Sequence, residues 1–120
     1  MPEVELDHVQ IAAPPGCEEA ARRFFAELVG LEELLKPEPL RARGGAWFRL
    51  GGRQLHVGVE ADFEPARKAH MALRLEATAL ERLAARLAEE GFPVTWDEGL
   101  PGERRFYSED PWGNRIEFLG

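Results

Sequence analysis

The sequence predicts an α+β fold in which one βαβββ module occurs twice. Two segments carry apolar residues at the spacing of an amphipathic helix, and each follows one strand-like segment and precedes three more. Short runs containing Gly and Pro separate these segments. Because both halves have the same order of elements, we interpret the chain as an internal duplication within a single domain, residues 1–120, with module one at about residues 1–60 and module two at about residues 69–120.

Module one begins with the stretch LDHVQIAA, whose alternation and β-branched residues predict a strand over residues 6–13. PPGC interrupts that pattern, and EEAARRFFAELVG then predicts an amphipathic helix over residues 18–30 with a glycine at its end. LEELLKP is predicted as a short strand, because the helix has already ended and prolines bound the run. AWFRLGGRQLHVGVE, residues 46–60, predicts a hairpin whose Gly51-Gly52 turn supplies positive φ angles.

Module two repeats the pattern after ADFEPARKA, which is expected to be a linker. HMALRLE predicts the first strand, and TALERLAARLAEEG predicts a helix with Leu80, Leu83 and Leu87 on one face. FPVTWDE predicts the next strand and GLPGE a loop.

The last hairpin, RRFYSEDPWGNRIEFLG, is predicted to turn at DPWGN. Asp110 and Pro111 are expected to start this turn, and Gly113 and Asn114 to supply its positive φ angles. The turn then sets the register of the last strand.

The charge balance argues against a nucleic-acid binder. The chain has 15 Lys and Arg against 22 Asp and Glu, a formal net charge of −7, and its arginines are interspersed with glutamates. No run approaches the roughly 20 apolar residues of a membrane span, and the acidic start is unlike a signal peptide. Cys17, the single cysteine, permits neither an internal disulfide nor a thiolate zinc site. We therefore expect a cytoplasmic protein without nucleic-acid or membrane partners.

The three histidines and one glutamate occupy duplicated positions. His8 and His70 stand near the start of the first strand of each module, 62 residues apart, and His56 and Glu117 stand in the last strands, 61 residues apart. Their neighbours along each strand are apolar, so the four polar side chains can share one sheet face while the apolar ones lie under the helices. Each residue alone is most simply an ordinary polar residue of a half-buried strand. Their joint placement favours a common site.

Three imidazoles and one carboxylate are the ligands that a divalent transition metal would select, whether Zn²⁺, Ni²⁺, Fe²⁺, Co²⁺ or Mn²⁺. The sequence therefore predicts a metal site made of His8, His56, His70 and Glu117. The histidines must be neutral to bind the ion. Glu117 is also the candidate catalytic base, because a carboxylate can loosen from a metal and accept a proton.

Three stretches, LDHVQIAA, ARRFFAELVGLEEL and above all FYSEDPWGNRIEFLG, resemble the vicinal oxygen chelate superfamily. This superfamily includes glyoxalase I, fosfomycin-resistance proteins, extradiol dioxygenases and bleomycin-resistance proteins. The resemblance covers nearly the whole chain. It implies paired βαβββ modules that form an open, cup-like mixed sheet with helices on the outside, usually in a homodimer.

The resemblance also implies metal ligands in the first and last strands of the modules. His8 matches the first-module ligand, His70 the second-module ligand and Glu117 the final-strand carboxylate. His56 stands where glyoxalase I uses a glutamate. Three ligands are the pattern of the fosfomycin and dioxygenase branches, whereas four suggest the glyoxalase or epimerase branch.

Three further residues are predicted to bind substrate. Arg104 and Arg105 alternate in direction, so one of them, which we take to be Arg105, faces inward and could hold a substrate carboxylate or phosphate. Tyr107 has the same parity and could offer its hydroxyl, and Trp47 could form an apolar wall. Each could equally be a core or solvated residue.

The leading functional hypothesis is a glyoxalase-like, metal-dependent lyase or isomerase that acts on a small, possibly anionic substrate with adjacent oxygens. The first alternative is an extradiol-type dioxygenase with Fe²⁺, in which His56 would fill a position that substrate or oxygen needs. The second is a metal-free drug-binding resistance protein. Fosfomycin thiol transfer is a weaker option, because Val9 and Gln10 stand where a hydroxyl is expected.

Overall fold

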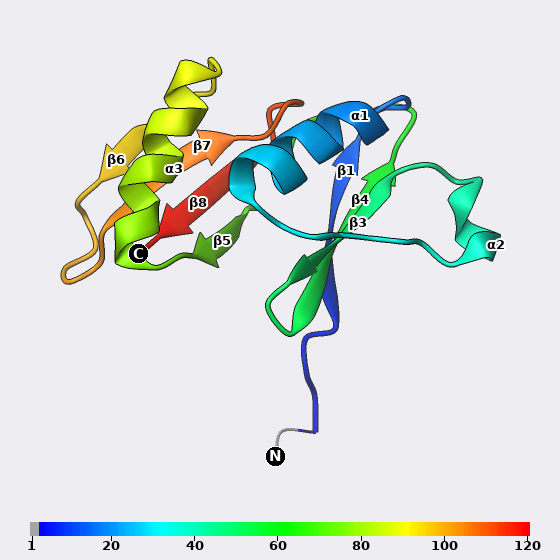
Figure 1. The fold of residues 1–120 in the computed structure, drawn as a ribbon, viewed down its shortest axis with the longest axis horizontal. Coiled ribbons are helices and arrows are strands. Elements are labelled where there is room, and N and C mark those ends of the chain that lie inside the picture. The colour runs from blue at the N-terminus through cyan, green and yellow to red at the C-terminus, as the bar shows by residue number, and fades with distance from the viewer. Residues whose placement is uncertain (1–2) are drawn as a thin grey trace. The chain divides into compact units, whose positions relative to one another are not determined.

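Two βαβββ modules make up the chain, as predicted, and each builds one four-stranded mixed sheet (Figure 1). The computed structural model describes residues 3–120. The chain divides into a first unit that ends at Phe63 and a second unit, Glu64–Gly120. None of the helices in residues 3–120 combines the length and the hydrophobicity that a bilayer crossing requires.

The sheet of the first unit has the strand order β1-β4-β3-β2. Its strands are β1 (His8–Ala13), β2 (Glu33–Leu34), β3 (Ala46–Leu50) and β4 (Arg53–Val59). β1 runs parallel to β4, whereas the other neighbours are antiparallel. The strand predicted in LEELLKP is present as the two-residue β2.

The helix of the first unit is α1 (Glu18–Ala21), which continues directly as the π-helical segment η1 (Arg22–Val29). It ends at the predicted glycine, Gly30, which has φ 96° and donates its N–H to the Phe25 carbonyl at 3.1 Å. A short helix that the sequence analysis did not predict, α2 (Glu38–Arg41), lies between β2 and β3.

The sheet of the second unit has the equivalent order β5-β8-β7-β6, again with its first and last strands parallel. Its elements are β5 (Met71–Arg74), α3 (Ala77–Glu89), β6 (Thr95–Asp97), β7 (Arg105–Glu109) and β8 (Arg115–Leu119). α3 contacts β8 and buries the predicted leucines, Leu80, Leu83 and Leu87 (Figure 1). Gly91, with φ 88°, follows its end.

The core of each unit lies between its helix and one face of its sheet. In the first unit, Phe24 and Phe25 of the helix pack near Phe48 of β3, with the Phe25 and Phe48 ring centroids 5.6 Å apart. In the second unit, Phe106 and Phe118 lie on neighbouring strands, 5.2 Å apart. Because side chains alternate along a strand, the positions between these residues face the opposite side of each sheet.

Two turns differ from the prediction at one residue each. Gly51 and Gly113 have the expected positive φ, 58° and 92°, but Gly52 and Asn114 do not. Asn114 instead uses its side chain: its Oδ1 accepts the Ala66 N–H at 2.9 Å, and its Nδ2 donates to Asp110 at 2.7 Å. The Asn114 side chain therefore connects the turn to the segment before β5. Asn114 has this role through its side-chain amide, and not through a left-handed backbone conformation.

Candidate functional site

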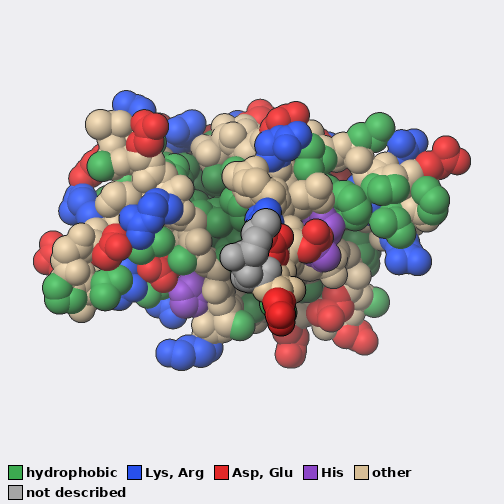
Figure 2. All heavy atoms as spheres, turned by 90° about the horizontal axis from the view of Figure 1, so that it is seen from below, with side chains coloured by type: hydrophobic (Ala, Val, Ile, Leu, Met, Phe, Trp, Pro, Cys, Tyr) green, Lys and Arg blue, Asp and Glu red, His purple; other side chains and the backbone are tan. Residues whose placement is uncertain are grey.

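The four predicted metal ligands come as one pair in each unit, on the sheet face away from the helix. His8 lies on β1 and His56 on β4, while His70 directly precedes β5 and Glu117 lies on β8. The register of the two units agrees, because the residue two positions after each first-strand histidine pairs with the last-strand residue: Gln10 with His56, and Ala72 with Glu117. Histidine side chains reach the surface in Figure 2, and the side chains of His8 and His70 are 42% and 23% exposed.

In the second unit, His70 and Glu117 face each other directly. His70 Nε2 lies 3.0 Å from Glu117 Oε1, and His70 Nδ1 lies 2.9 Å from the Lys68 carbonyl oxygen. A carbonyl oxygen only accepts hydrogen bonds, so Nδ1 carries a hydrogen. Nε2 of the neutral ring then presents a lone pair to a carboxylate oxygen, and these two acceptors require a cation between them, either a proton or a metal ion.

Arg105 holds the other oxygen of the same carboxylate. Its Nη1 donates to Glu117 Oε2 at 3.2 Å and its Nη2 to Asp97 Oδ2 at 3.4 Å, while its buried Nε has no hydrogen-bond partner among residues 3–120. Burial alone would raise the pKa of Glu117, but its interactions with His70 and Arg105 outweigh burial and hold this pKa below its usual range. Glu117 is thereby kept ionised and is a weaker base than a free glutamate.

The predicted alternation of the two arginines is present. Arg105 faces Glu117, whereas Arg104 pairs with Glu81 and lies 4.1 Å above the Trp96 ring. The sequence analysis predicted the direction of Arg105 but missed its carboxylate partners. Glu117 lies 12 positions further along the chain, and only the register of the β7–β8 hairpin brings the two together.

Tyr107 lies beside the pair in the second unit. It is directly opposite Glu117 in the sheet, and its ring is 5.7 Å from the His70 ring in an edge-on arrangement. The Arg115 guanidinium lies 3.9 Å above it. A cavity of about 350 Å³ opens here, whose lining includes Tyr107, the two cationic residues Arg67 and Arg115 and one anionic residue, Glu109.

In the first unit, His56 lies between two other rings. The Trp47 ring is parallel to it at 3.9 Å, with an interplanar angle of 1°, and the His8 ring stacks on it at 4.2 Å. His56 Nε2 lies 2.8 Å from Gln54 Oε1. Burial, followed by the charge of His8, lowers the pKa of His56, which favours its neutral form.

His8 has the same outer contact as His70. Its Nδ1 lies 2.9 Å from Asp7 Oδ2, and the pKa of Asp7 is lowered, with its hydrogen bond to His8 as the first cause. An ionised carboxylate only accepts, so Nδ1 carries the hydrogen and Nε2 carries the lone pair. His56 has the opposite tautomer, because its Nε2 donates to the Gln54 oxygen.

Two cavities of the first unit contain residues that the sequence analysis did not select. One, of about 210 Å³, is lined by Trp47 and His56 together with Gln10, Lys36 and Arg43 among others. Gln10 has the parity of His8, a signal that could have identified it.

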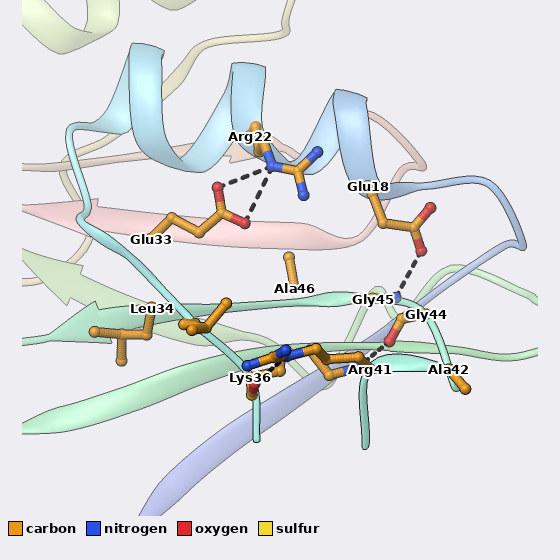
Figure 3. Close-up of a pocket in the computed structure, with 11 residues that line it drawn as sticks. Glu18, Arg22, Glu33, Leu34, Lys36, Arg41, Ala42, Gly44, Gly45 and Ala46 are labelled. Atoms are coloured by element: carbon orange, nitrogen blue, oxygen red, sulfur yellow. Dashed lines mark hydrogen bonds and ion pairs between the residues drawn. The ribbon is translucent and has the colours of Figure 1, made fainter. Parts of the chain in front are cut away.

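The other cavity, of about 580 Å³, lies between α1 and the segment that joins β2 to β3, and contains none of the predicted site residues (Figure 3). Its charged side chains already have partners, including the Arg22–Glu33 ion pair at 2.9 Å and the Glu18 carboxylate on the Gly45 N–H at 2.6 Å. We assign it no functional role.

The pair in the second unit is arranged as two ligands of one metal ion would be, whereas the pair in the first unit is not. Within residues 3–120, no three His, Cys, Asp or Glu side chains gather in an arrangement that could hold an ion. His70 Nε2 and Glu117 Oε1 converge on one point, as two ligands of one ion would. The stacked rings of His8 and His56 do not converge, because a metal lies in the plane of the imidazole that binds it.

Comparisons with known proteins identify relatives along nearly the whole chain. The family model of the Glyoxalase/Bleomycin resistance protein/Dioxygenase superfamily matches residues 6–118. The solved structure of a glyoxalase family protein from Bacillus anthracis is 46% identical, with a TM-score of 0.89 over 97% of this chain and 93% of that chain. No curated protein matches the chain.

Two other solved structures share the fold at lower identity. A lactoylglutathione lyase from Agrobacterium tumefaciens is 18% identical, with a TM-score of 0.75 over 99% of this chain and 95% of that chain. A fosfomycin resistance protein from Listeria monocytogenes is 14% identical, with a TM-score of 0.76 over 97% of this chain and 92% of that chain. At these identities the likeness concerns the fold alone.

Proposed function

Because this chain belongs to the Glyoxalase/Bleomycin resistance protein/Dioxygenase superfamily, we propose that it is a metal-dependent enzyme of the glyoxalase type, a lyase or isomerase. Its substrate would be a small molecule with two adjacent oxygen atoms. We further propose that His8, His70 and Glu117 bind the metal, one divalent ion of the group Zn²⁺, Ni²⁺, Fe²⁺, Co²⁺ and Mn²⁺. The homodimer expected from the resemblance is retained as a prediction, which the molar mass in solution tests.

The contact between His70 and Glu117 carries this proposal. Two acceptor atoms 3.0 Å apart need a cation between them, and the Lys68 carbonyl keeps the only hydrogen of a neutral ring on the far nitrogen. The pKa of Glu117 is lowered, so the carboxylate is available as an anion. A divalent ion would satisfy both atoms without an imidazolium.

The contacts of His56 differ from those of a metal ligand. Its Nε2 is engaged by Gln54, and its ring is covered on both faces by Trp47 and His8. We therefore propose that His56, the fourth predicted ligand, supports the His8 ring and forms a wall of the site together with Trp47.

A bound divalent ion would act as a Lewis acid that stabilises negative charge on the two chelated substrate oxygens. Glu117 is also proposed to accept the proton that the reaction removes. Because its Oε1 would otherwise hold the metal and Arg105 occupies its Oε2, the carboxylate would have to loosen from the ion before Oε1 could accept that proton. Because Arg105 occupies Oε2 and the pKa is lowered, this base suits a substrate C–H that has already been made acidic. Arg67 and Arg115 outnumber the single carboxylate, Glu109, in the lining of the neighbouring cavity, which supports an anionic substrate.

Arg105 is proposed to act on the substrate indirectly. Two of its nitrogens bond to Glu117 and Asp97, so its first role would be to orient the base. Direct contact with a substrate carboxylate, as the sequence analysis predicts, would be through the remaining hydrogens of the guanidinium.

Metal content tests the ligand set. We expect purified protein to hold a divalent ion that is lost from His8→Ala, His70→Ala and Glu117→Ala and retained in His56→Ala. Glu109→Ala, which removes a carboxylate from the neighbouring strand β7, is the control. Wild-type metal content in His8→Ala, His70→Ala and Glu117→Ala would overturn the proposal, and loss in His56→Ala would restore the four-ligand set.

An extradiol-type dioxygenase is the second candidate, and the contact between His56 and Gln54 favours it. If His56 is not a ligand, His8, His70 and Glu117 form the two-histidine, one-carboxylate set of non-haem iron oxygenases, with positions left for substrate and oxygen. Protein loaded anaerobically with Fe²⁺ would then consume oxygen when catechols are added. No uptake across a range of catechols, together with turnover of 2-oxoaldehyde adducts of glutathione, would decide for the glyoxalase type.

A further inference from the structure

We propose that Asp7 is a positioning residue for His8: its carboxylate accepts the hydrogen bond from the Nδ1–H of the ring and so keeps on Nε2 the lone pair that would bind a metal. This inference rests on the proposed function, because it concerns how one of the proposed ligands is prepared. It adds a residue that neither the sequence analysis nor the family resemblance selected.

The geometry of the pair defines its chemistry. Asp7 Oδ2 lies 2.9 Å from His8 Nδ1. A neutral imidazole has one N–H, so a carboxylate on Nδ1 leaves Nε2 with the lone pair that a metal needs. Histidines that bind metals commonly donate their other N–H to a carboxylate or a backbone carbonyl.

The second unit repeats the arrangement with a different group. His70, the duplicated counterpart of His8, has its Nδ1 2.9 Å from the Lys68 carbonyl oxygen. Both first-strand histidines therefore have the same tautomer, although a side chain selects it in one unit and the backbone in the other. His56 has the opposite tautomer. The two histidines proposed as metal ligands, His8 and His70, thus share one tautomer. His56, which we do not propose as a ligand, differs from them.

Two contacts together fix the His8 ring. Stacking on His56, with centroids 4.2 Å apart, sets the plane of the ring, and Asp7 sets which edge faces outward. The Asp7 side chain is 95% exposed and covers no apolar surface. Its removal should therefore leave the folded protein intact, which separates an effect on metal binding from an effect on stability.

Co²⁺ affinity, measured by competition with a chelator on the full chain, tests the proposal. Asp7→Ala should bind Co²⁺ about 10-fold more weakly than wild type, the lower end of the effect of such outer contacts. Asp7→Asn keeps an acceptor for Nδ1–H and should recover part of that loss. Glu5→Gln removes a charge two residues away, from a carboxylate 3.9 Å from Arg53, and should stay within about twofold of wild type.

Long-range ¹H–¹⁵N spectra of the imidazoles in the metal-free protein give a second readout. Wild type should show Nδ1–H at His8 and His70 and Nε2–H at His56. In Asp7→Ala only the His8 signals should move toward a mixture of tautomers, while His70 serves as the internal reference because its partner is the backbone.

The outcomes separate this inference from the proposed function. Absence of Co²⁺ binding by wild type overturns both. Weak binding by His8→Ala together with wild-type affinity and an unchanged His8 tautomer in Asp7→Ala overturns the role of Asp7 alone. Equal losses in Asp7→Ala, Asp7→Asn and Glu5→Gln would reduce the effect to general charge and also overturn it.

Discussion

The two units build the same scaffold and place different chemistry on it. In the first unit, the last-strand residue His56 lies between the Trp47 and His8 rings. In the second, the equivalent Glu117 lies between His70 and the guanidinium of Arg105. Both last-strand residues are only 6% exposed. One half of the duplication therefore buries a neutral ring by stacking, and the other buries a charge by hydrogen bonding.

The difference shows what a duplicated fold determines. Strand order and register decide which positions meet, and in both units the histidine at the start of the first strand contacts the last-strand residue. The residue types then decide the interaction, because a carboxylate removed from water needs charged or N–H partners, whereas a neutral imidazole can be covered by aromatic rings. The substitutions below test this division, beginning with the scaffold itself.

Gly45→Ala should have the largest effect, and it should fall on the first unit. Gly45 has φ 84°, and an added Cβ would lie 2.1 Å from the Val57 carbonyl oxygen of β4. Left-handed strain and the backbone clash together should lower the free energy of unfolding by about 4 kcal/mol. Because β3 starts at the next residue, the register that sets Trp47 opposite His56 should be lost as well.

Gly16→Ala is the matched control for that substitution. Gly16 has a similar φ, 82°, but an added Cβ there meets nothing within 4 Å. Backbone strain alone should cost about 1 to 2 kcal/mol, as urea denaturation would measure. Equal losses in the two variants would show that the close approach of β3 and β4 at Gly45 has no energetic role.

The interactions of the two last-strand residues should differ in strength. In metal-free protein, Glu117→Gln breaks an almost buried ion network with His70 and Arg105 and should lower the free energy of unfolding by about 2 kcal/mol. His56→Gln loses ring stacking and should cost about 1 kcal/mol.

Glu109→Gln is the control for this comparison, because it removes the same charge from β7 outside that network. It should leave the free energy of unfolding within about 0.5 kcal/mol of wild type. A cost for His56→Gln that equals or exceeds the cost for Glu117→Gln would contradict the ranking of charge pairing above stacking.

Much of this arrangement could be predicted from the sequence, because periodicity and spacing are local properties. The helix that ends at Gly30 and the leucine face of α3 follow from helical spacing and a terminal glycine. The equivalence of His8 with His70, and of His56 with Glu117, follows from the duplicated spacing. The sequence analysis predicted one common site, whereas the structure shows a separate contact within each unit. The ligand roles themselves remain predictions.

The contacts that distinguish the two units could not be predicted in the same way. The bonds of Arg105 to Glu117 and of His56 to Gln54 depend on side-chain rotamers and strand register. The short helix α2 was not predicted, because it has only four residues and its proline-containing sequence shows no helical periodicity of apolar residues. The sequence predicts a left-handed backbone at Asn114. The hydrogen bond that its side chain accepts from the Ala66 N–H could not be predicted, because the two residues are 48 positions apart.

The two helices also differ at their starts, and Glu18→Gln should show this with an effect that becomes the smallest of these in acid. The Glu18 carboxylate at the start of α1 accepts the Gly45 N–H at 2.6 Å, whereas the residue before α3 makes no side-chain cap. This bond is the first cause that lowers the native pKa of Glu18 below its ordinary value, 4.5. The carboxylate therefore stabilises the fold fully above pH 4.5, and this contribution is lost as the pH falls through the lowered native pKa.

Glu18→Gln should lower the free energy of unfolding by about 1 kcal/mol at neutral pH and by progressively less in acid. Urea denaturation of wild type, Glu18→Gln and the exposed neighbour Glu19→Gln across this range measures the difference, and a cost for Glu18→Gln that stays constant into acid would contradict it.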